Sequence, residues 1–413
     1  MRQLTSLLLA TLLVAGCAAP AATSAPSLSP SAPAATAAPP TVPPASASTM
    51  SPSPSAATTL TVDWNAADLT GIDAVEAITG VAKAGDTYVL LASLPYTDEG
   101  SPNSSVWWSG DGTDWTLGTV FPAATRMLAL TAGGPGFVAS GFNDGGSPLW
   151  TSADGRTWEA VNDSSLDNAV INQLVATDSG VVGFGWRSDS EAPGIWTSAD
   201  GVEWLAATNE TGMKVAKGLQ VVGAYDGRAI AFVDEGEKEP PAIWETTGRA
   251  EWTRTGALTE VAAISRVAGG ARGWVALDDD KAWTSTDGTT WSKGVPGPDV
   301  SSDVVVDDAG YVAVGFIGSL PGDTCGDQRP FAGHTWTSAD GVTWQMMPVT
   351  DEFEAAMVTK LLVVDRTLVG YGQLIREDTS NGLPVAQWTD TLPDLSSPAD
   401  ASDEASVPKT CGG

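Results

Sequence analysis

A nine-residue motif with a tryptophan at each end recurs along the chain and constrains its fold more than any other feature. It reads WTSADGRTW at 150–158, WTSADGVEW at 196–204, WTSTDGTTW at 283–291 and WTSADGVTW at 336–344. Aligning the first tryptophan of each unit gives steps of 43, 46, 48, 39, 53 and 52 residues between Trp107, Trp150, Trp196, Trp244, Trp283, Trp336 and Trp388. A period in the forties is typical of a four-stranded propeller blade.

A short apolar strand pattern precedes each of these tryptophans. It recurs at 86–93, 136–142, 180–186, 227–233, 273–278, 310–316 and 367–373, and another apolar stretch that ends in a turn comes before each copy. Each unit therefore reads as strand A, turn, strand B, loop, strand C with its tryptophan, an Asp-Gly turn, and strand D with a second tryptophan. Seven such units predict an all-β, seven-bladed propeller over about 58–390.

The Asp-Gly turn suggests how the two tryptophans of a unit are paired. Ser152 and Gly155 suit positions i and i+3 of a type I turn, which gives a three-residue loop with a bulge. In that register Trp150 lies directly opposite Trp158 on one face. A two-residue loop would instead send the two rings to opposite faces. We expect the aspartate between them to bond backbone N–H groups of its own turn.

Fourteen of the seventeen tryptophans occupy these two slots, as six pairs plus Trp388 and Trp64. A tryptophan buries about 150–250 Å², which suits a ring that fills the gap between neighbouring blades better than one that stacks on a ligand. The last unit has a C strand at 384–393 without a following tryptophan, whereas 60–65 is a strand with a tryptophan and no preceding C strand. We therefore expect the N-terminal strand to complete the last blade and to hide the open edges.

The Ser-x-Asp-Gly-x-x-Trp pattern resembles the Asp-box, or BNR, repeat of sialidase-like propellers. Five units match it in full, at Ser109, Ser152, Ser198, Ser285 and Ser338, whereas the fourth reads WETTGRAEW at 244–252. The resemblance implies the fold, with the boxes on the face away from the active sites of the family. The early Phe/Tyr-Arg-Ile-Pro motif of sialidases is missing from the sequence. Tyr88 and Tyr311 fall in a strand-B slot and are interpreted as core residues.

The N-terminus has the features of an export signal. Residues 1–16 combine a cationic start, an apolar run and small residues, and the run is too short for a stable membrane span. LVAGC at 13–17 resembles the bacterial lipobox, which implies a lipid on Cys17. The Ala/Pro/Ser/Thr-rich segment 17–57 is then an extended linker that lifts the folded domain from the cell membrane on its extracytoplasmic side.

The other two cysteines, Cys325 and Cys411, are expected to form a disulfide in an exported protein. That bond would tie the acidic tail 391–413 to a loop of the sixth blade. A metal held by this pair is much less expected.

The charge of the chain and the composition of its loops limit the kinds of ligand that it can bind. Fifty Asp and Glu residues against twenty Lys and Arg give a net charge of −30, which repels nucleic acid and anionic lipid. The densest acidic cluster on the B–C loops comprises Glu235, Glu237, Asp278, Asp279 and Asp280, and its spacing does not match a calcium site. Arg126 and Arg266 lie on expected inner strands and could face the channel. No cofactor or metal is predicted.

These features favour a monomeric, non-catalytic binding or scaffolding propeller, with a protein or carbohydrate ligand at the B–C and D–A loops and contact with the membrane through its lipid only. The alternative is a carbohydrate-active hydrolase, sialidase-like or of another glycosidase type, with two carboxylates at the channel mouth.

Overall fold

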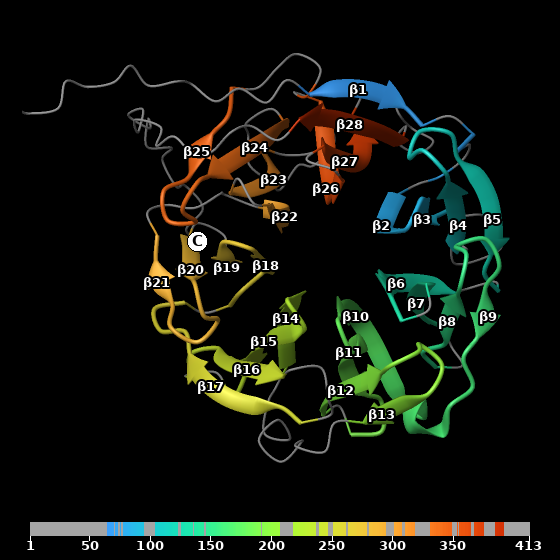
Figure 1. Ribbon diagram of the computed structural model, residues 1–413, viewed down its shortest axis with the longest axis horizontal. Helices are drawn as coiled ribbons and strands as arrows, with labels where there is room; N and C mark the ends of the chain where they lie inside the picture. The colour runs from blue at the N-terminus through green and yellow to red at the C-terminus, as the bar shows by residue number, and fades with distance from the viewer. Residues whose placement is uncertain are drawn as a thin grey trace, which may run out of the picture. The chain divides into compact units, whose positions relative to one another are not determined.

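The folded part of the chain is an array of four-stranded antiparallel sheets. The computed structural model describes residues 64–391 with gaps, the longest of which are 95–103, 207–217, 295–300, 319–330 and 376–384. The chain divides into two compact units, Met1–Ser55 and Ala56–Gly413, and the described residues belong to the second. They form seven four-stranded sheets that follow one another around a ring (Figure 1). We number these blades 1 to 7 in chain order of their innermost strands.

Each blade is written from its inner to its outer strand. Blades 1 to 3 comprise β2 (Ala77–Ala84), β3 (Thr87–Ser93), β4 (Ser104–Ser109) and β5 (Thr116–Val120); β6 (Arg126–Gly133), β7 (Gly136–Phe142), β8 (Leu149–Ser152) and β9 (Glu159–Ala160); and β10 (Ala169–Thr177), β11 (Gly180–Arg187), β12 (Pro193–Ser198) and β13 (Trp204–Ala206). A 3-10 turn, η1 (Ser164–Leu166), lies between β9 and β10.

Blades 4 to 6 comprise β14 (Gly218–Tyr225), β15 (Arg228–Asp234), β16 (Ala242–Thr246) and β17 (Thr253–Ala257); β18 (Arg266–Gly270), β19 (Gly273–Asp278), β20 (Lys281–Ser285) and β21 (Ser292–Lys293); and β22 (Ser301–Val306), β23 (Tyr311–Ile317), β24 (Ala332–Ser338) and β25 (Gln345–Met346). Blade 7 comprises β26 (Ala356–Val364), β27 (Thr367–Leu374), β28 (Val385–Thr391) and β1 (Asn65–Asp68).

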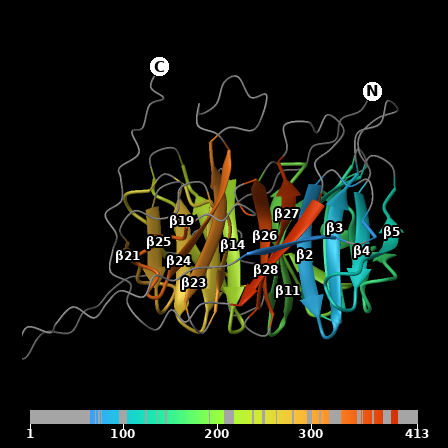
Figure 2. The ribbon, with the colours of Figure 1, turned by 90° about the horizontal axis from the view of Figure 1, so that it is seen from above.

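The inner strands close the ring. Each of them contacts the inner strand of the next blade, and β26 contacts β2. Seen from the side, inner strands such as β2 and β14 run close to the direction of the ring axis, whereas β28 and β1 cross that direction at an angle (Figure 2). On the axis, apolar side chains of five inner strands surround a hollow of about 320 Å³. The predicted all-β propeller of four-stranded blades is confirmed.

The N-terminal strand completes blade 7 as predicted, but it covers Asn65–Asp68 rather than 60–65, and residues 60–63 lie outside the described part of the chain. β1 pairs antiparallel with β28, and Ala66 lies opposite Trp388. Trp64 directly precedes β1 and is buried. Its ring stacks on Phe353 with 5.1 Å between centroids, and its Nε1 donates a 2.9 Å hydrogen bond to Oγ1 of Thr335 in blade 6. The first strand is therefore held by side-chain packing as well as by its backbone ladder.

The tryptophans fill the seams between blades. In one hydrophobic cluster, Trp196 and Trp204 of blade 3 pack with Val138 of blade 2. In another, Trp283 and Trp291 of blade 5 pack with Phe232 of blade 4. The two rings of each of the six pairs belong to the same cluster, so both face the same neighbouring blade. The structural interpretation of the tryptophans is confirmed.

The predicted register of the pair is wrong. Trp150 lies opposite Ala160 rather than Trp158, and in blade 3 the pair that closes the hairpin is Ser198 with Trp204. Five residues therefore separate the closing pair, whereas a three-residue loop was expected. Side-chain hydrogen bonds inside the turn hold this wider loop. The two rings still share a face, because the shift is by two residues and strand faces alternate with period two.

Those hydrogen bonds repeat from box to box. In blade 2, Oγ of Ser152 accepts the N–H of Gly155 at 2.9 Å. Oδ1 of Asp154 accepts the N–H groups of Arg156 and Thr157, both at 2.9 Å. Gly155 has a φ of +75°, which favours glycine. The expectation that the aspartate bonds backbone of its own turn is confirmed.

Several predicted features lie outside the described residues: the signal 1–16, Cys17, the linker 17–57, the tail beyond Thr391, and the cysteines Cys325 and Cys411. Within the residues that are described, no helix has the length and apolar character needed to cross a membrane.

Candidate functional site: a groove between blades 2 and 3

A groove of about 1120 Å³ opens between blades 2 and 3. Its walls come from the end of β7 with the loop to β8, the connection from β9 to β10, and Ser188 after β11. The lining residues are Phe142, Asn143, Gly146, Ser147, Pro148, Leu149, Val161, Asn162, Asp163, Ser164, Leu166, Asp167, Asn168, Ala169, Val170 and Ser188.

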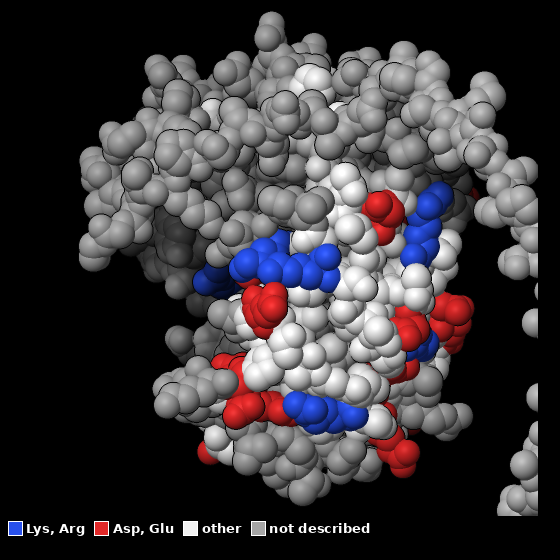
Figure 3. All heavy atoms as spheres, turned by 90° about the vertical axis from the view of Figure 1, so that its left-hand side faces the viewer, with Lys and Arg blue, Asp and Glu red and all other residues white. Residues whose placement is uncertain are grey.

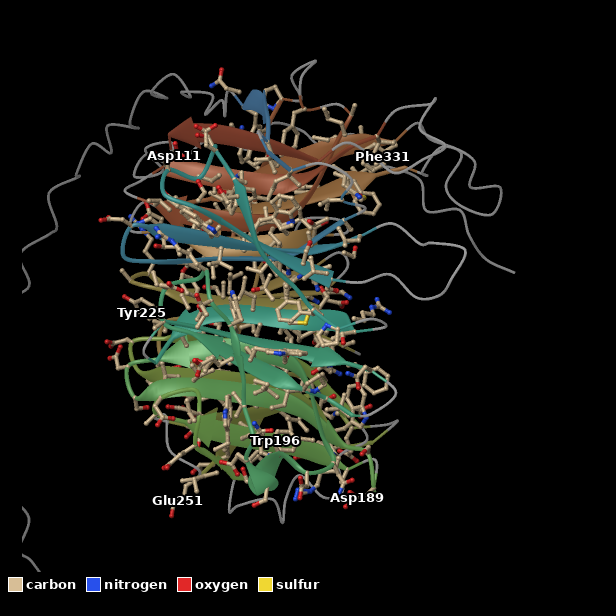
Figure 4. The ribbon with its side chains drawn as sticks, turned by 90° about the vertical axis from the view of Figure 1, so that its right-hand side faces the viewer. Asp111, Asp189, Trp196, Tyr225, Glu251 and Phe331 are labelled. Carbon is tan, nitrogen blue, oxygen red and sulfur yellow. The ribbon has the colours of Figure 1, made fainter. Side chains whose placement is uncertain are left out.

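The groove lies at the end of the ring opposite to the Asp-boxes. In the side view, Asp111 of the first box, Tyr225 and Glu251 lie toward one end, and Asp189 and Phe331 toward the other (Figure 4). The groove is built from B–C and D–A loops, which belong to the end that Asp189 marks.

Asp163 anchors the wall formed by the β9–β10 connection. As the N-cap of η1, its Oδ1 accepts the N–H of Ser165 at 2.8 Å. Its Oδ2 accepts the N–H of Trp204 at 2.7 Å. Ser165 adds a 2.8 Å bond from Oγ to the carbonyl of Trp204. The N–H groups of Trp204 and then Ser165 lower the pKa of the Asp163 carboxyl. Asp163 is therefore an ionised structural group that fixes this loop on blade 3.

Asp167 is the second carboxylate of the groove and is differently placed. It is exposed, and its carboxylate makes no hydrogen bond within the described part of the chain. The next residue, Asn168, adopts a left-handed φ of 63°. The carbonyl of Asn168 accepts the N–H of Ser188 at 2.8 Å. This bond joins the two loops and leaves the Asp167 carboxylate available to a ligand.

Two exposed aromatic rings belong to this end of blades 2 and 3. Phe142 is 45% exposed at the end of β7 and lines the groove. Trp186 is 39% exposed near the end of β11. Arg126 lies opposite Phe142 across the β6–β7 ladder and is exposed. An aromatic face beside polar side chains suits a ligand with both apolar and hydroxyl surfaces.

Four buried side-chain polar atoms of blades 2 and 3 lack a hydrogen-bond partner in the part of the chain that the structure describes. Ser140 Oγ, Ser147 Oγ, Asn172 Oδ1 and Arg187 Nη1 have no hydrogen-bond partner within the described residues. Ser140 shares a face of β7 with Val138, which packs against blade 3, and Arg187 shares a face of β11 with Val181, which packs against blade 2. Buried polar groups are normally hydrogen-bonded, and of these four residues Ser147 lines the groove.

The two described residues of the predicted acidic rim, Glu235 and Asp278, each pair with a different basic side chain. Glu235 accepts hydrogen bonds from Nε and Nη2 of Arg254, both at 3.1 Å, and another from Trp244 Nε1 at 3.3 Å. Asp278 pairs with Lys281 at 3.5 Å. Glu237, Asp279 and Asp280 lie outside the described residues. On the side of the ring that carries β17, β21 and β25, basic and acidic side chains lie next to one another (Figure 3). Among the residues described, no group of three potential metal ligands occurs.

The two predicted arginines lie in different blades. Arg126 begins β6 in blade 2, whereas Arg266 begins β18 in blade 5. Arg266 uses Nε to bond the carbonyl of Ser302 and Nη1 to bond that of Ser265. Arg266 therefore connects blade 5 to blade 6 through its bond to Ser302. Of the two predicted arginines, Arg126 is the one that lies beside the groove.

Sequence reasoning missed Phe142, Asp167 and Arg187. The sequence carries a weak signal for them, since VNDSSLDNA at 161–169 concentrates acids and amides in one D–A connection. The tyrosines interpreted as core residues do belong there. Tyr311 is buried with its hydroxyl on the carbonyl of Arg272, and Tyr88 packs against the cluster of blade 1.

Comparisons with known proteins find likeness in solved structures only. No family model matches the chain, and no curated protein does so. A Trypanosoma rangeli sialidase mutant that displays trans-sialidase activity is 13% identical, with a TM-score of 0.43, over 81% of this chain and 60% of that one. The phage phi92 endosialidase is 9% identical, with a TM-score of 0.45, over 84% and 72%. The oligogalacturonate lyase of Vibrio parahaemolyticus is 7% identical, with a TM-score of 0.49, over 81% and 98%. The chain thus spans 60% of the sialidase mutant's length, and its structural neighbours include sialidases at distant identity.

Proposed function

We propose that this chain is a lipid-anchored, extracytoplasmic binding protein whose groove between blades 2 and 3 holds an uncharged carbohydrate. The observation that supports this proposal most is the lining of the groove. It combines the side-chain amides of Asn143, Asn162 and Asn168 with the free carboxylate of Asp167 and the exposed ring of Phe142.

Sugar chemistry fits this lining. An asparagine amide both donates and accepts hydrogen bonds, and a carboxylate accepts them, so together they match hydroxyl groups. The apolar C–H face of a sugar packs on an aromatic ring. The net charge of −30 and the two groove carboxylates oppose an anionic ligand. An uncharged sugar satisfies the groove without these electrostatic costs.

The second candidate is a carbohydrate-active hydrolase, the kind of activity named for the two sialidase structures above. A two-carboxylate mechanism needs one acid that is protonated near neutral pH. Both oxygens of Asp163 accept backbone N–H bonds that keep its pKa low. Within the described lining of the groove, Asp167 is then the one carboxylate free to act, which favours binding over turnover.

Binding is tested with the full-length chain purified in detergent and with malto-, cello-, manno- and chito-hexaose as calorimetric probes. We expect at least one of these neutral hexamers to bind, and a galacturonate hexamer to bind more weakly. Phe142→Ala and Asp167→Asn should each weaken the neutral ligand about tenfold. Tyr225→Ala and Asp114→Asn remove an exposed ring and an exposed carboxylate at the opposite end of the ring, and they should not change the affinity.

The same samples decide between the two candidates. Mass spectrometry after long incubation should find the hexamers intact. Shortened products from the wild-type chain, lost in Asp167→Asn, would establish the hydrolase instead. Absence of binding to all neutral probes, or equal binding by the groove variants, would contradict the proposed site.

The membrane anchor rests on the lipobox at 13–17 and the linker at 17–57. Three acyl chains hold a protein firmly, since each buried CH₂ contributes about 0.8 kcal/mol. We expect a Cys17→Ala variant to leave the membrane fraction. Its retention there would require another anchor.

A further inference from the structure

Trp186 repeats, one blade further along the ring, the position that Phe142 occupies beside the groove. Each lies at the end of a strand B that leads into a B–C loop, Phe142 in β7 and Trp186 in β11. By contrast, Phe316 and Phe331 of blade 6 stack on one another at 5.3 Å and are only partly exposed. Within the described residues, blades 2 and 3 therefore carry the exposed aromatic rings of this end.

The two rings lie on opposite sides of blade 3. Phe142 shares a face of β7 with Val138, which packs in the seam between blades 2 and 3. Trp186 shares a face of β11 with Phe184, which packs in the seam between blades 3 and 4. Because packed sheets are about 10 Å apart, a single sugar ring cannot contact both aromatic side chains. A ligand that uses both must cross the end of blade 3.

The end of blade 3 between the two rings is polar. Ser188, Asp189 and Ser190 are exposed there, and Oδ1 of Asp189 accepts a 3.0 Å bond from the Ser190 hydroxyl. The carbonyl of Asn168 holds Ser188 in place through its N–H. The exposed side chains at this end of blade 3 offer hydrogen-bond donors and acceptors to the hydroxyl groups of a sugar chain. The carboxylates of Asp167 and Asp189 along the same path oppose a polyanion.

We infer that the ligand is an uncharged polysaccharide that runs from the groove across the end of blade 3 to Trp186, so that successive sugar units contact Phe142 and Trp186. This inference rests on the proposed function and adds a second subsite to it. Each aromatic contact contributes separately, so the affinity rises with the number of sugar units until both rings are covered.

The test compares dimers with hexamers of the malto, cello, manno and chito series on the full-length chain. In the series that binds, we expect the hexamer to bind at least about tenfold more tightly than the dimer. Trp186→Ala should reduce that ratio about two- to twelvefold, the range of one aromatic contact, and Trp186→Phe should restore most of it. Phe142→Ala should weaken both oligomers alike, and Tyr225→Ala should leave the ratio unaltered.

The outcomes separate the two levels of the proposal. If Phe142→Ala lowers the affinity for the hexamer but Trp186→Ala does not change it, the second subsite is overturned and the groove remains the binding site. Failure of every dimer and hexamer to bind would overturn both. A melting temperature equal to that of the wild type shows that the exposed Trp186 variants are folded.

Discussion

The aspartate of each Asp-box caps its own turn. Asp111, Asp154, Asp200 and Asp287 each accept two backbone N–H groups through one oxygen, at 2.7 to 3.0 Å. In Asp154 the N–H of Thr157 and then that of Arg156 lower the pKa of the carboxyl. A lowered pKa means that the folded state stabilises the charged carboxylate more than the unfolded state does. The stabilisation is complete above the ordinary aspartate pKa of about 3.9, and it is lost as the pH falls through the folded-state value.

We expect Asp154→Ala to lower the free energy of unfolding by about 1 kcal/mol at pH 7, the size of a lost cap. Asp154→Asn should cost less, because its amide oxygen still accepts the N–H groups. The difference between wild type and Asp154→Ala should shrink as the pH falls below about 4. Urea unfolding measured at pH 7 and pH 3 checks this. Asp114→Ala is the matched control, since that exposed carboxylate makes no hydrogen bond within the described residues. A difference that does not depend on pH would contradict the charged cap.

At the scale of the strand, the inner strands share an irregularity that links the blades. The register shifts once in β2, β6, β10, β14, β22 and β26. Such a bulge leaves backbone groups without ladder partners. A side chain from the preceding blade bonds near several of them: Gln173 bonds the backbone of Gln220 and Val222, and Asp303 accepts the N–H of Leu361. The bulges are therefore points at which one blade holds the next.

Gln173 tests this link. Its Nε2 donates to the carbonyl of Gln220 at 3.1 Å, and its Oε1 accepts the N–H of Val222 at 2.9 Å. We expect Gln173→Ala to lower the free energy of unfolding by about 1–3 kcal/mol, because two backbone groups lose their partners. Gln173→Glu keeps the acceptor and loses the donor, so it should be destabilised at pH 7 and recover as the new carboxyl is protonated. Urea unfolding against pH measures both variants. If Gln173→Ala is as stable as the wild type, Gln173 does not contribute to holding blade 4 on blade 3.

The sequence predicted the elements well and their interactions unevenly. Apolar runs such as 136–142 and 180–186 became β7 and β11, because alternation of buried positions is a local property. The register of Trp150 was wrong because side-chain bonds of Ser152 and Asp154 widen the turn, and such bonds compete with the ladder. Gln173 gave no signal, since its partners belong to another blade. The groove was missed for the same reason: Phe142 and Asp167 meet only after two blades pack.

For the whole molecule, stability depends on how the ring is closed. Blade 7 is built from both ends of the propeller, and its outer strand β1 has four residues. So short a strand adds few ladder bonds, and the buried ring of Trp64 supplies much of its attachment. That ring lies in the seam with blade 6, in a cluster with Val312, Phe353 and Leu368. In the other blades the hairpin of the box holds the outer strand, whereas in blade 7 the side chain must do so.

We therefore expect Trp64→Ala to be among the most destabilising single changes in the propeller. It removes a buried ring, its stack on Phe353 and its bond to Thr335, and comparable core truncations cost about 3–5 kcal/mol. Trp158→Ala is the matched control, since Trp158 is only partly buried. The outer strand that follows Trp158 is also connected to its neighbour β8 through the hairpin of the Asp-box, which β1 lacks. Urea unfolding of both variants gives the comparison, and hydrogen exchange locates the effect. In Trp64→Ala we expect the β28 amides that face β1 to exchange faster than in the wild type and before the rest of the ring opens. The reason is that an outer strand that detaches exposes these amides first. If Trp64→Ala costs no more than Trp158→Ala and β28 stays protected, the backbone ladder alone is enough to close the ring.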